Sequence, residues 1–104
     1  SSGLAVVLTS EPSEARHIPS IDVTMRSAAR SRPGHVLGIL LTGMGEDGAE
    51  GMTTIRAGGG VTIAESESSC VVYGMPRAAI RRGGASLVLP LEQIVELLAA
   101  LPAR

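Results

Sequence analysis

The chain has 104 residues, of which 44% are apolar and 18% charged, and its formal net charge is −1. This length predicts one compact domain, and no apolar run is long enough to insert into a membrane. Tyr73 is the single aromatic residue and lysine is absent, which argues against nucleic-acid binding and excludes Schiff-base chemistry.

Cysteine and histidine are scarce. Cys70 is the only cysteine, so the chain cannot form an internal disulfide, and with His17 and His35 it supplies too few ligands for a structural zinc site. We therefore expect no metal and no other cofactor. A cytoplasmic location, where thiols stay reduced, fits this composition.

The first elements follow from hydropathy. Residues 4–9 form an apolar run typical of a strand, and residues 10–18 predict a polar loop. Pro19 suits the first turn of a helix, because its missing N–H costs nothing there. The helix that follows ends at residues 32–34 and has one apolar face. The residues on that face are Ile21, Met25, Ala28 and Ala29.

The central segment has the strongest pattern. Residues 36–41 are almost continuously aliphatic and are bounded by Gly34 and Gly43, which predicts a strand buried on both faces of a parallel sheet. A loop over 42–48 and a short helix over about 49–57 follow.

The remaining elements repeat the alternation of strand and helix. Residues 61–64 predict a strand, 76–81 a helix and 85–89 another buried strand. Pro90 opens a final helix with one apolar face, made of Leu91, Ile94, Val95, Leu98 and Leu101. The whole pattern predicts an α/β fold with right-handed crossovers.

The segment Thr42–Gly48, here called the glycine loop, is the candidate functional element. In open parallel sheets, sites form outside the carboxyl ends of the strands, and this loop follows the most apolar strand. Gly43, Gly45 and Gly48 allow sharp turns and close approach of the backbone to another group. Three interpretations are open.

The first interpretation is a dinucleotide-binding fingerprint. Residues 43–48 match G-x-G-x-x-G, with Glu65 or Glu67 at about the distance of the ribose-binding acid. Glu46 and Asp47 would oppose a pyrophosphate at that position.

The other two interpretations concern Asp47. It is typical of a turn residue that caps a helix. It is equally suited to orient a catalytic histidine, while a backbone N–H such as that of Met44 faces a developing oxyanion.

Three blocks give the chain a family resemblance. They are LLTGMGEDGA at 40–49, VVYGMPR at 71–77 and HIPSID at 17–22. Together they resemble the catalytic domain of chemotaxis protein-glutamate methylesterases of the CheB type, from about residue 15 to 98. The resemblance implies a doubly wound, mostly parallel α/β sheet and a Ser-His-Asp hydrolase that demethylates, and in some members deamidates, chemoreceptor helices.

The resemblance also implies roles for individual residues. The catalytic aspartate of the family corresponds to Asp47, and its oxyanion-stabilising methionine, acting through the backbone N–H, corresponds to Met44. Glu65 stands where the family usually has glutamine. The residues expected near the site are Gly43, Gly45, Gly74, Met75, Pro76, Arg77 and His17, of which His17 does not match the catalytic histidine.

The serine and the catalytic histidine of the family lie N-terminal to every matched block. We therefore expect residues 1–104 to be the C-terminal portion of the catalytic domain, without a receiver domain and inactive alone. Expected partners are methylated chemoreceptor helices, an upstream receiver domain and a second copy through the edge where strands are missing. The alternatives are a non-catalytic module that binds a dinucleotide or other anion through Gly43–Gly48, or a degenerate scaffold.

Three polar or reactive residues have simpler interpretations. Cys70, beside two valines, is expected to be a small buried side chain. His35 is expected to be exposed, and Asp22 to be a carboxylate in the first turn of a helix.

Overall fold

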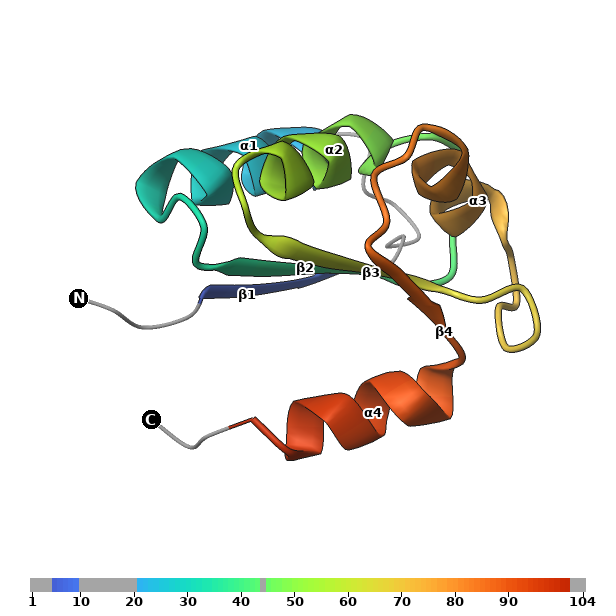
Figure 1. The fold of residues 1–104 in the computed structure, drawn as a ribbon. Helices are drawn as coiled ribbons and strands as arrows, with labels where there is room; N and C mark the ends of the chain where they lie inside the picture. The colour runs from blue at the N-terminus through green and yellow to red at the C-terminus, as the bar shows by residue number, and fades with distance from the viewer. Residues whose placement is uncertain (1–4, 10–20, 44, 102–104) are drawn as a thin grey trace.

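The computed structural model describes residues 5–9, 21–43 and 45–101, and shows an α/β fold (Figure 1). Its elements are β1 (Ala5–Thr9), α1 (Ile21–Ser31), β2 (Val36–Leu40), α2 (Ala49–Ala57), β3 (Val61–Glu65), α3 (Gly74–Arg81), β4 (Leu87–Leu89) and α4 (Leu91–Ala99). The expectations for residues 10–18, Pro19, His17 and Met44 lie outside the described residues.

The described strands form one parallel sheet in the order β1-β2-β3-β4. Helices α1, α2 and α3 cover one face and α4 covers the other (Figure 1). Neighbouring parallel strands joined by helices on one face are what right-handed crossovers produce. Helices on both faces confirm the expected doubly wound α/β class.

Each face of the sheet has its own apolar core. Under α1–α3 the buried residues are Met25, Val36, Leu40, Ala49, Met52, Ile55, Met75 and Ala79. Under α4 they are Leu37, Ile39, Ile63 and Ile94. All five residues of β2 are buried because successive side chains enter opposite cores, which confirms the prediction of a strand covered on both faces.

Two glycines bring α1 and α2 close together near the candidate site. A Cβ atom on Gly51 would lie 2.6 Å from the Cβ of Met25. Gly48 has φ +103°, and a Cβ atom there would lie 2.8 Å from a methyl carbon of Leu40. A side chain at Gly51 would force the two helices apart, and one at Gly48 would clash with Leu40 of β2 and crowd Ile21 of α1.

The last three elements, α3, β4 and α4, each differ from expectation in one respect. The last strand is shorter than 85–89, and Leu87 and Val88 are 43% and 44% exposed, because β4 lies at the sheet edge. Leu91 and Val95 of α4 are also exposed, since only part of the helix's apolar face reaches the sheet. Helix α3 begins at Gly74, two residues before Pro76.

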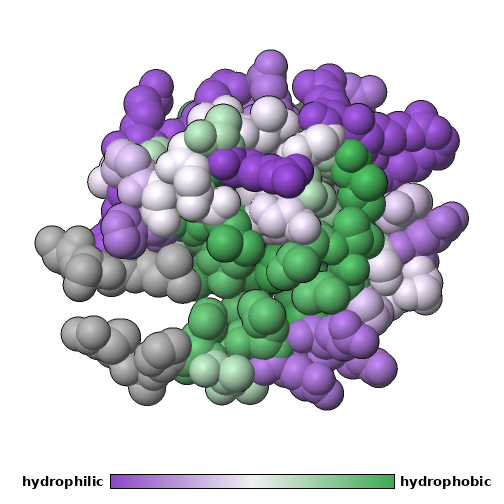
Figure 2. All heavy atoms as spheres, in the orientation of Figure 1, coloured by the Kyte–Doolittle hydropathy of each residue, from purple (hydrophilic) through white to green (hydrophobic). Residues whose placement is uncertain are grey.

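These exposed side chains contribute to an apolar surface. Figure 2 shows hydrophobic side chains across the middle of the molecule, at the level of the sheet, with mostly hydrophilic side chains over the helices above. No helix among the described residues is both long and apolar enough to span a bilayer.

Candidate active site at the carboxyl ends of the strands

The glycine loop, after β2, is joined by hydrogen bonds to the segment after β3. The Gly43 N–H donates to the carbonyl oxygen of Val72 (2.8 Å), and the Met75 N–H donates to the carbonyl oxygen of Gly43 (2.8 Å). The Thr42 hydroxyl donates to the same Val72 oxygen (3.0 Å) and accepts from the Val72 N–H (2.7 Å). Two blocks of sequence about thirty residues apart therefore form one unit.

Asp47 lies at the far end of the glycine loop and holds the start of α1. Its Oδ2 accepts a hydrogen bond from the Ile21 N–H and its Oδ1 accepts one from the Asp22 N–H, both at 3.0 Å. These charge-assisted hydrogen bonds fix the orientation of the carboxylate. Asp47 therefore caps a helix, but one distant in sequence. The residue at the start of α2 is Gly48, without a side-chain cap.

Asp22 makes the reciprocal arrangement. It lies in the first turn of α1, as expected, and its Oδ1 accepts from the N–H groups of Gly48 (3.0 Å) and Gly51 (2.7 Å) at the start of α2. Each aspartate thus satisfies amides that have no partner within their own helix. The two aspartates therefore join the end of the glycine loop to the N-termini of α1 and α2.

The same hydrogen bonds argue against a dinucleotide site in the glycine loop. A pyrophosphate would need the amides at the start of α2, and the Gly48 and Gly51 amides already donate to Asp22. Glu46 is exposed and forms an ion pair with Arg82 at 3.0 Å. The G-x-G-x-x-G match therefore reflects turns in the loop rather than a phosphate cradle.

The other predicted site residues fall into two groups. Gly45 and Arg77 are exposed, Gly45 with φ +91°. Met75 and Pro76 are buried in the first turns of α3, where Met75 belongs to the core under α1–α3 and thus packs rather than reacts. Gly74, half-buried, begins that helix. The roles predicted for Met44 and His17 stay predictions, because both residues lie outside the described part of the chain.

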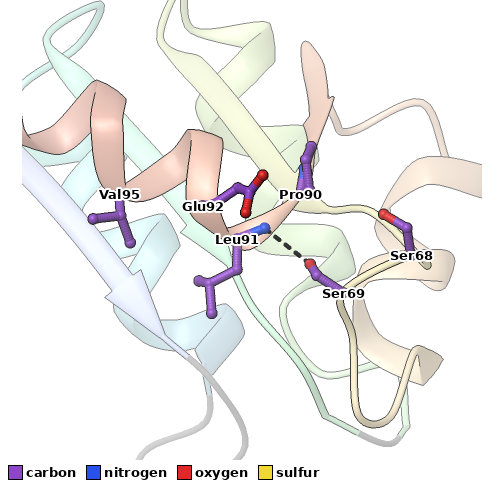
Figure 3. A pocket seen from close by; sticks show the side chains of 6 residues that line it. All are labelled: Ser68, Ser69, Pro90, Leu91, Glu92 and Val95. Carbon is purple, nitrogen blue, oxygen red and sulfur yellow. Dashed lines mark hydrogen bonds between the residues drawn. The ribbon is translucent and has the colours of Figure 1, made fainter.

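Glu65 is a site feature whose partners the sequence did not indicate. Its Oε1 accepts from the Thr42 N–H (2.9 Å) and its Oε2 accepts from the Ser69 hydroxyl (2.7 Å). Ser69 in turn accepts from the Leu91 N–H at the start of α4 (2.9 Å), the bond drawn in Figure 3. The sequence marked Glu65 only as a departure from the glutamine of the family or as a possible ribose-binding acid, and gave no sign of these partners.

Cys70 is half-buried rather than buried, and its thiol donates to the carbonyl oxygen of Glu65 at 3.6 Å. Burial, and then the negative charge of Glu65, raise the pKa of Cys70 to about 11. A hydrogen bond to Glu65 and the charge of Glu67 act in the same direction. The thiol is therefore protonated at neutral pH and is a poor nucleophile. His35 is exposed, as expected.

The fold and the anchored aspartate define an α/β protein whose candidate site lies outside the carboxyl ends of a parallel sheet. A family model described as CheB methylesterase matches residues 3–98. The chain therefore belongs to the CheB methylesterase family, which confirms the resemblance seen in the sequence.

Individual relatives agree. A protein-glutamate methylesterase/protein-glutamine glutaminase of Caldanaerobacter subterraneus subsp. tengcongensis is 52% identical over 94% of this chain and 27% of the relative. A protein of the same description from Ralstonia nicotianae is 51% identical over 84% of this chain and 23% of the relative. The chain thus spans about a quarter of the length of these relatives.

A solved structure shares the fold. The Thermotoga maritima CheB methylesterase catalytic domain is 41% identical, with a TM-score of 0.74 over 77% of this chain and 42% of that domain.

Proposed function

We propose that this chain is the C-terminal portion of the catalytic domain of a protein-glutamate methylesterase, with glutaminase as a second activity. In this proposal Asp47 is the triad acid and the Met44 backbone N–H is an oxyanion donor. The observation that carries the proposal is the position of the Asp47 carboxylate, anchored by two amides at the carboxyl edge of the sheet. The descriptions of the relatives support the reaction.

The anchored carboxylate retains capacity for a histidine. An ionised carboxylate offers about four lone-pair sites on its two oxygens, and the Ile21 and Asp22 amides take one on each oxygen. An imidazole N–H can therefore still donate to Asp47. That contact would fix the tautomer of the histidine and stabilise its protonated form.

The proposed reaction is acyl transfer. A serine Oγ attacks the carbonyl carbon of the glutamate methyl ester while the histidine takes its proton. The histidine then protonates the leaving methoxide, which departs as methanol, and water hydrolyses the acyl-enzyme. With a glutamine substrate, ammonia leaves instead. We expect the serine and the histidine to come from polypeptide outside this chain.

The proposed partners follow from this reaction. The substrates are methylated glutamates on chemoreceptor helices, and an upstream receiver domain is a proposed regulator. A second copy of the chain is a proposed partner through the β1 edge. A cytoplasmic location is also proposed, in keeping with a lone cysteine that cannot form an internal disulfide.

A hybrid domain tests the proposal. In it, this chain replaces the matching segment of the Thermotoga maritima CheB methylesterase catalytic domain, and methanol release from methylated chemoreceptor is measured. We expect turnover by the hybrid domain and a loss of roughly 10⁴-fold in Asp47→Asn.

Glu46→Gln is the matched control, because it alters the neighbouring carboxylate, which is exposed and paired with Arg82. It should retain turnover. Equal turnover in Asp47→Asn and Glu46→Gln would refute the triad role. A well-folded but inactive hybrid domain would instead favour the scaffold.

A further inference from the structure

A buried carboxylate lies where the glycine loop, the segment after β3 and α4 meet. Glu65 is 2% exposed. The two ion pairs found among the described residues, Arg26–Glu50 and Arg82–Glu46, lie on the surface and neither includes Glu65. Burying a carboxylate without a cation costs free energy, which its hydrogen bonds must offset. The hydrogen-bond partners of Glu65 must therefore supply the free energy that offsets its burial.

The hydrogen bonds around Glu65 run in one direction. The Leu91 N–H donates to the Ser69 Oγ, and the Ser69 hydroxyl donates to Oε2 of Glu65. From the other side, the Thr42 N–H donates to Oε1. Both carboxylate oxygens act as acceptors, a pattern that an ionised glutamate satisfies fully. A glutamine has only one side-chain oxygen, which could accept from the Thr42 N–H, and its NH₂ group would then reverse the bond to Ser69, whose hydroxyl can also accept.

We propose that Glu65 is a positioning residue of the candidate active site, which fixes the first residue of the glycine loop, Thr42, relative to the first residue of α4, Leu91. Thr42 is also bonded twice to Val72, so it is held from two sides. From Thr42 the chain runs directly into the loop that ends in Asp47 and Gly48. The chain of hydrogen bonds from the Leu91 N–H through Ser69 and Glu65 to the Thr42 N–H is here called the relay. The relay does not depend on the proposed function, whereas an effect of Glu65 on catalysis does.

Amide hydrogen exchange of the complete 104-residue chain, measured by NMR, tests the relay. Glu65→Ala should speed exchange of both the Thr42 and the Leu91 amides at least about tenfold. Ser69→Ala should do so for Leu91 alone, and Glu65→Gln should give a smaller effect. The amide of Ile39, in the buried strand β2, reports global unfolding and shows how much of each acceleration comes from a loss of overall stability.

Ser68→Ala is the matched control, since the hydroxyl of this exposed neighbour pairs with Ser66 and not with Glu65. Unchanged exchange in Glu65→Ala, or equal effects of Ser68→Ala and Ser69→Ala, would overturn the relay. If Glu65→Ala does not fold, Ser69→Ala decides, because the relay requires faster exchange at Leu91 without a change at Thr42.

The hybrid domain tests the link to catalysis. There Glu65→Ala should lower kcat about tenfold or more with little change in KM. The substitution would shift the glycine loop, which carries the proposed reacting groups, and would remove no contact with the substrate. Unchanged kcat would overturn the positioning role. Loss of turnover in the hybrid domain that retains Glu65 would count against the proposed function alone, because the exchange measurements do not depend on it.

Discussion

The side chains of Asp22 and Asp47 cap two neighbouring helices reciprocally: Asp47 binds amides at the start of α1, where Asp22 lies, and Asp22 binds amides at the start of α2, which follows Asp47. Asp47 accepts from the Ile21 and Asp22 amides of α1, and Asp22 accepts from the Gly48 and Gly51 amides at the start of α2. The two carboxylates therefore share one structural unit. Loss of either side chain should disturb both helix starts.

Asp22→Ala should lower the free energy of unfolding by about 1–3 kcal/mol, because it leaves the Gly48 and Gly51 amides without their acceptor. Urea denaturation of the chain measures this change. Glu50→Ala is the control, since it removes an acid from the first turn of α2, and the surface ion pair of Glu50 with Arg26 is worth about 1 kcal/mol at most. Equal losses in the two variants would contradict the reciprocal capping.

Gly51→Ala should lower the free energy of unfolding by roughly 1–3 kcal/mol. The new methyl group would lie 2.6 Å from the Cβ of Met25, and so would push α1 away from α2. Gly58→Ala is the matched substitution, because φ there is −83° and the nearest atom would be 3.6 Å away. We expect it to be neutral or to stabilise by about 0.4–1 kcal/mol. Thermal denaturation distinguishes the two, and similar melting temperatures would refute the close packing.

The sequence predicted best those elements whose ends are set by neighbouring residues in the chain. Helix α2 spans Ala49–Ala57 as expected, since glycines flank it on both sides, and β2 is an aliphatic run interrupted only by Gly38. The strand predicted over 85–89 was assigned to the interior, but it lies at the edge. A short apolar run looks the same in either place, because sheet order depends on contacts between distant segments.

The candidate site shows the same limit. The glycine loop and Asp47 were identified because turn residues and a carboxylate follow a strand. The partners of Asp47 lie 25 and 26 residues earlier in the chain, and local pattern does not reveal such contacts. Glu65 was noted only as a departure from the family or as a ribose-binding acid. Its burial and its hydrogen bonds to Thr42 and Ser69 depend on three segments that meet only in the fold.

Cys70 should react slowly with iodoacetamide. Its pKa is raised from 9.0 to about 11, first by burial and then by Glu65, so at pH 8 the fraction of thiolate is about 100-fold lower than in an unfolded chain. The same chain in urea is the control and should react at the ordinary rate. Glu65→Gln should restore part of the rate by removing the negative charge. Equal rates in the folded and unfolded chains would contradict the raised pKa.

The purified chain should release no methanol from a methyl-ester peptide. The described partners of the Asp47 carboxylate are backbone amides, and His35 precedes β2, at the opposite end of that strand from the glycine loop. Within the described segments, no histidine is placed to act as the base. Gas chromatography of methanol measures the activity, with the hybrid domain as positive control. Turnover by the chain alone would mean that it holds a nucleophile and a base of its own.

The edge of β1 should mediate self-association. Val6 and Leu8 are 43% and 52% exposed, whereas the alternate residue Val7 packs against the core under α1–α3. In the sheet formed by the described strands, β1 therefore presents an open backbone edge beside an apolar face. Light scattering after size exclusion should show dimers at high concentration. Leu8→Glu should shift them to monomers, because a charge there opposes burial of the strand. Val71→Glu alters a side chain that is 89% exposed but distant from this edge, in the segment between β3 and α3, and should leave the dimers intact. A monomer at every concentration, or dissociation by both substitutions alike, would rule out pairing through β1.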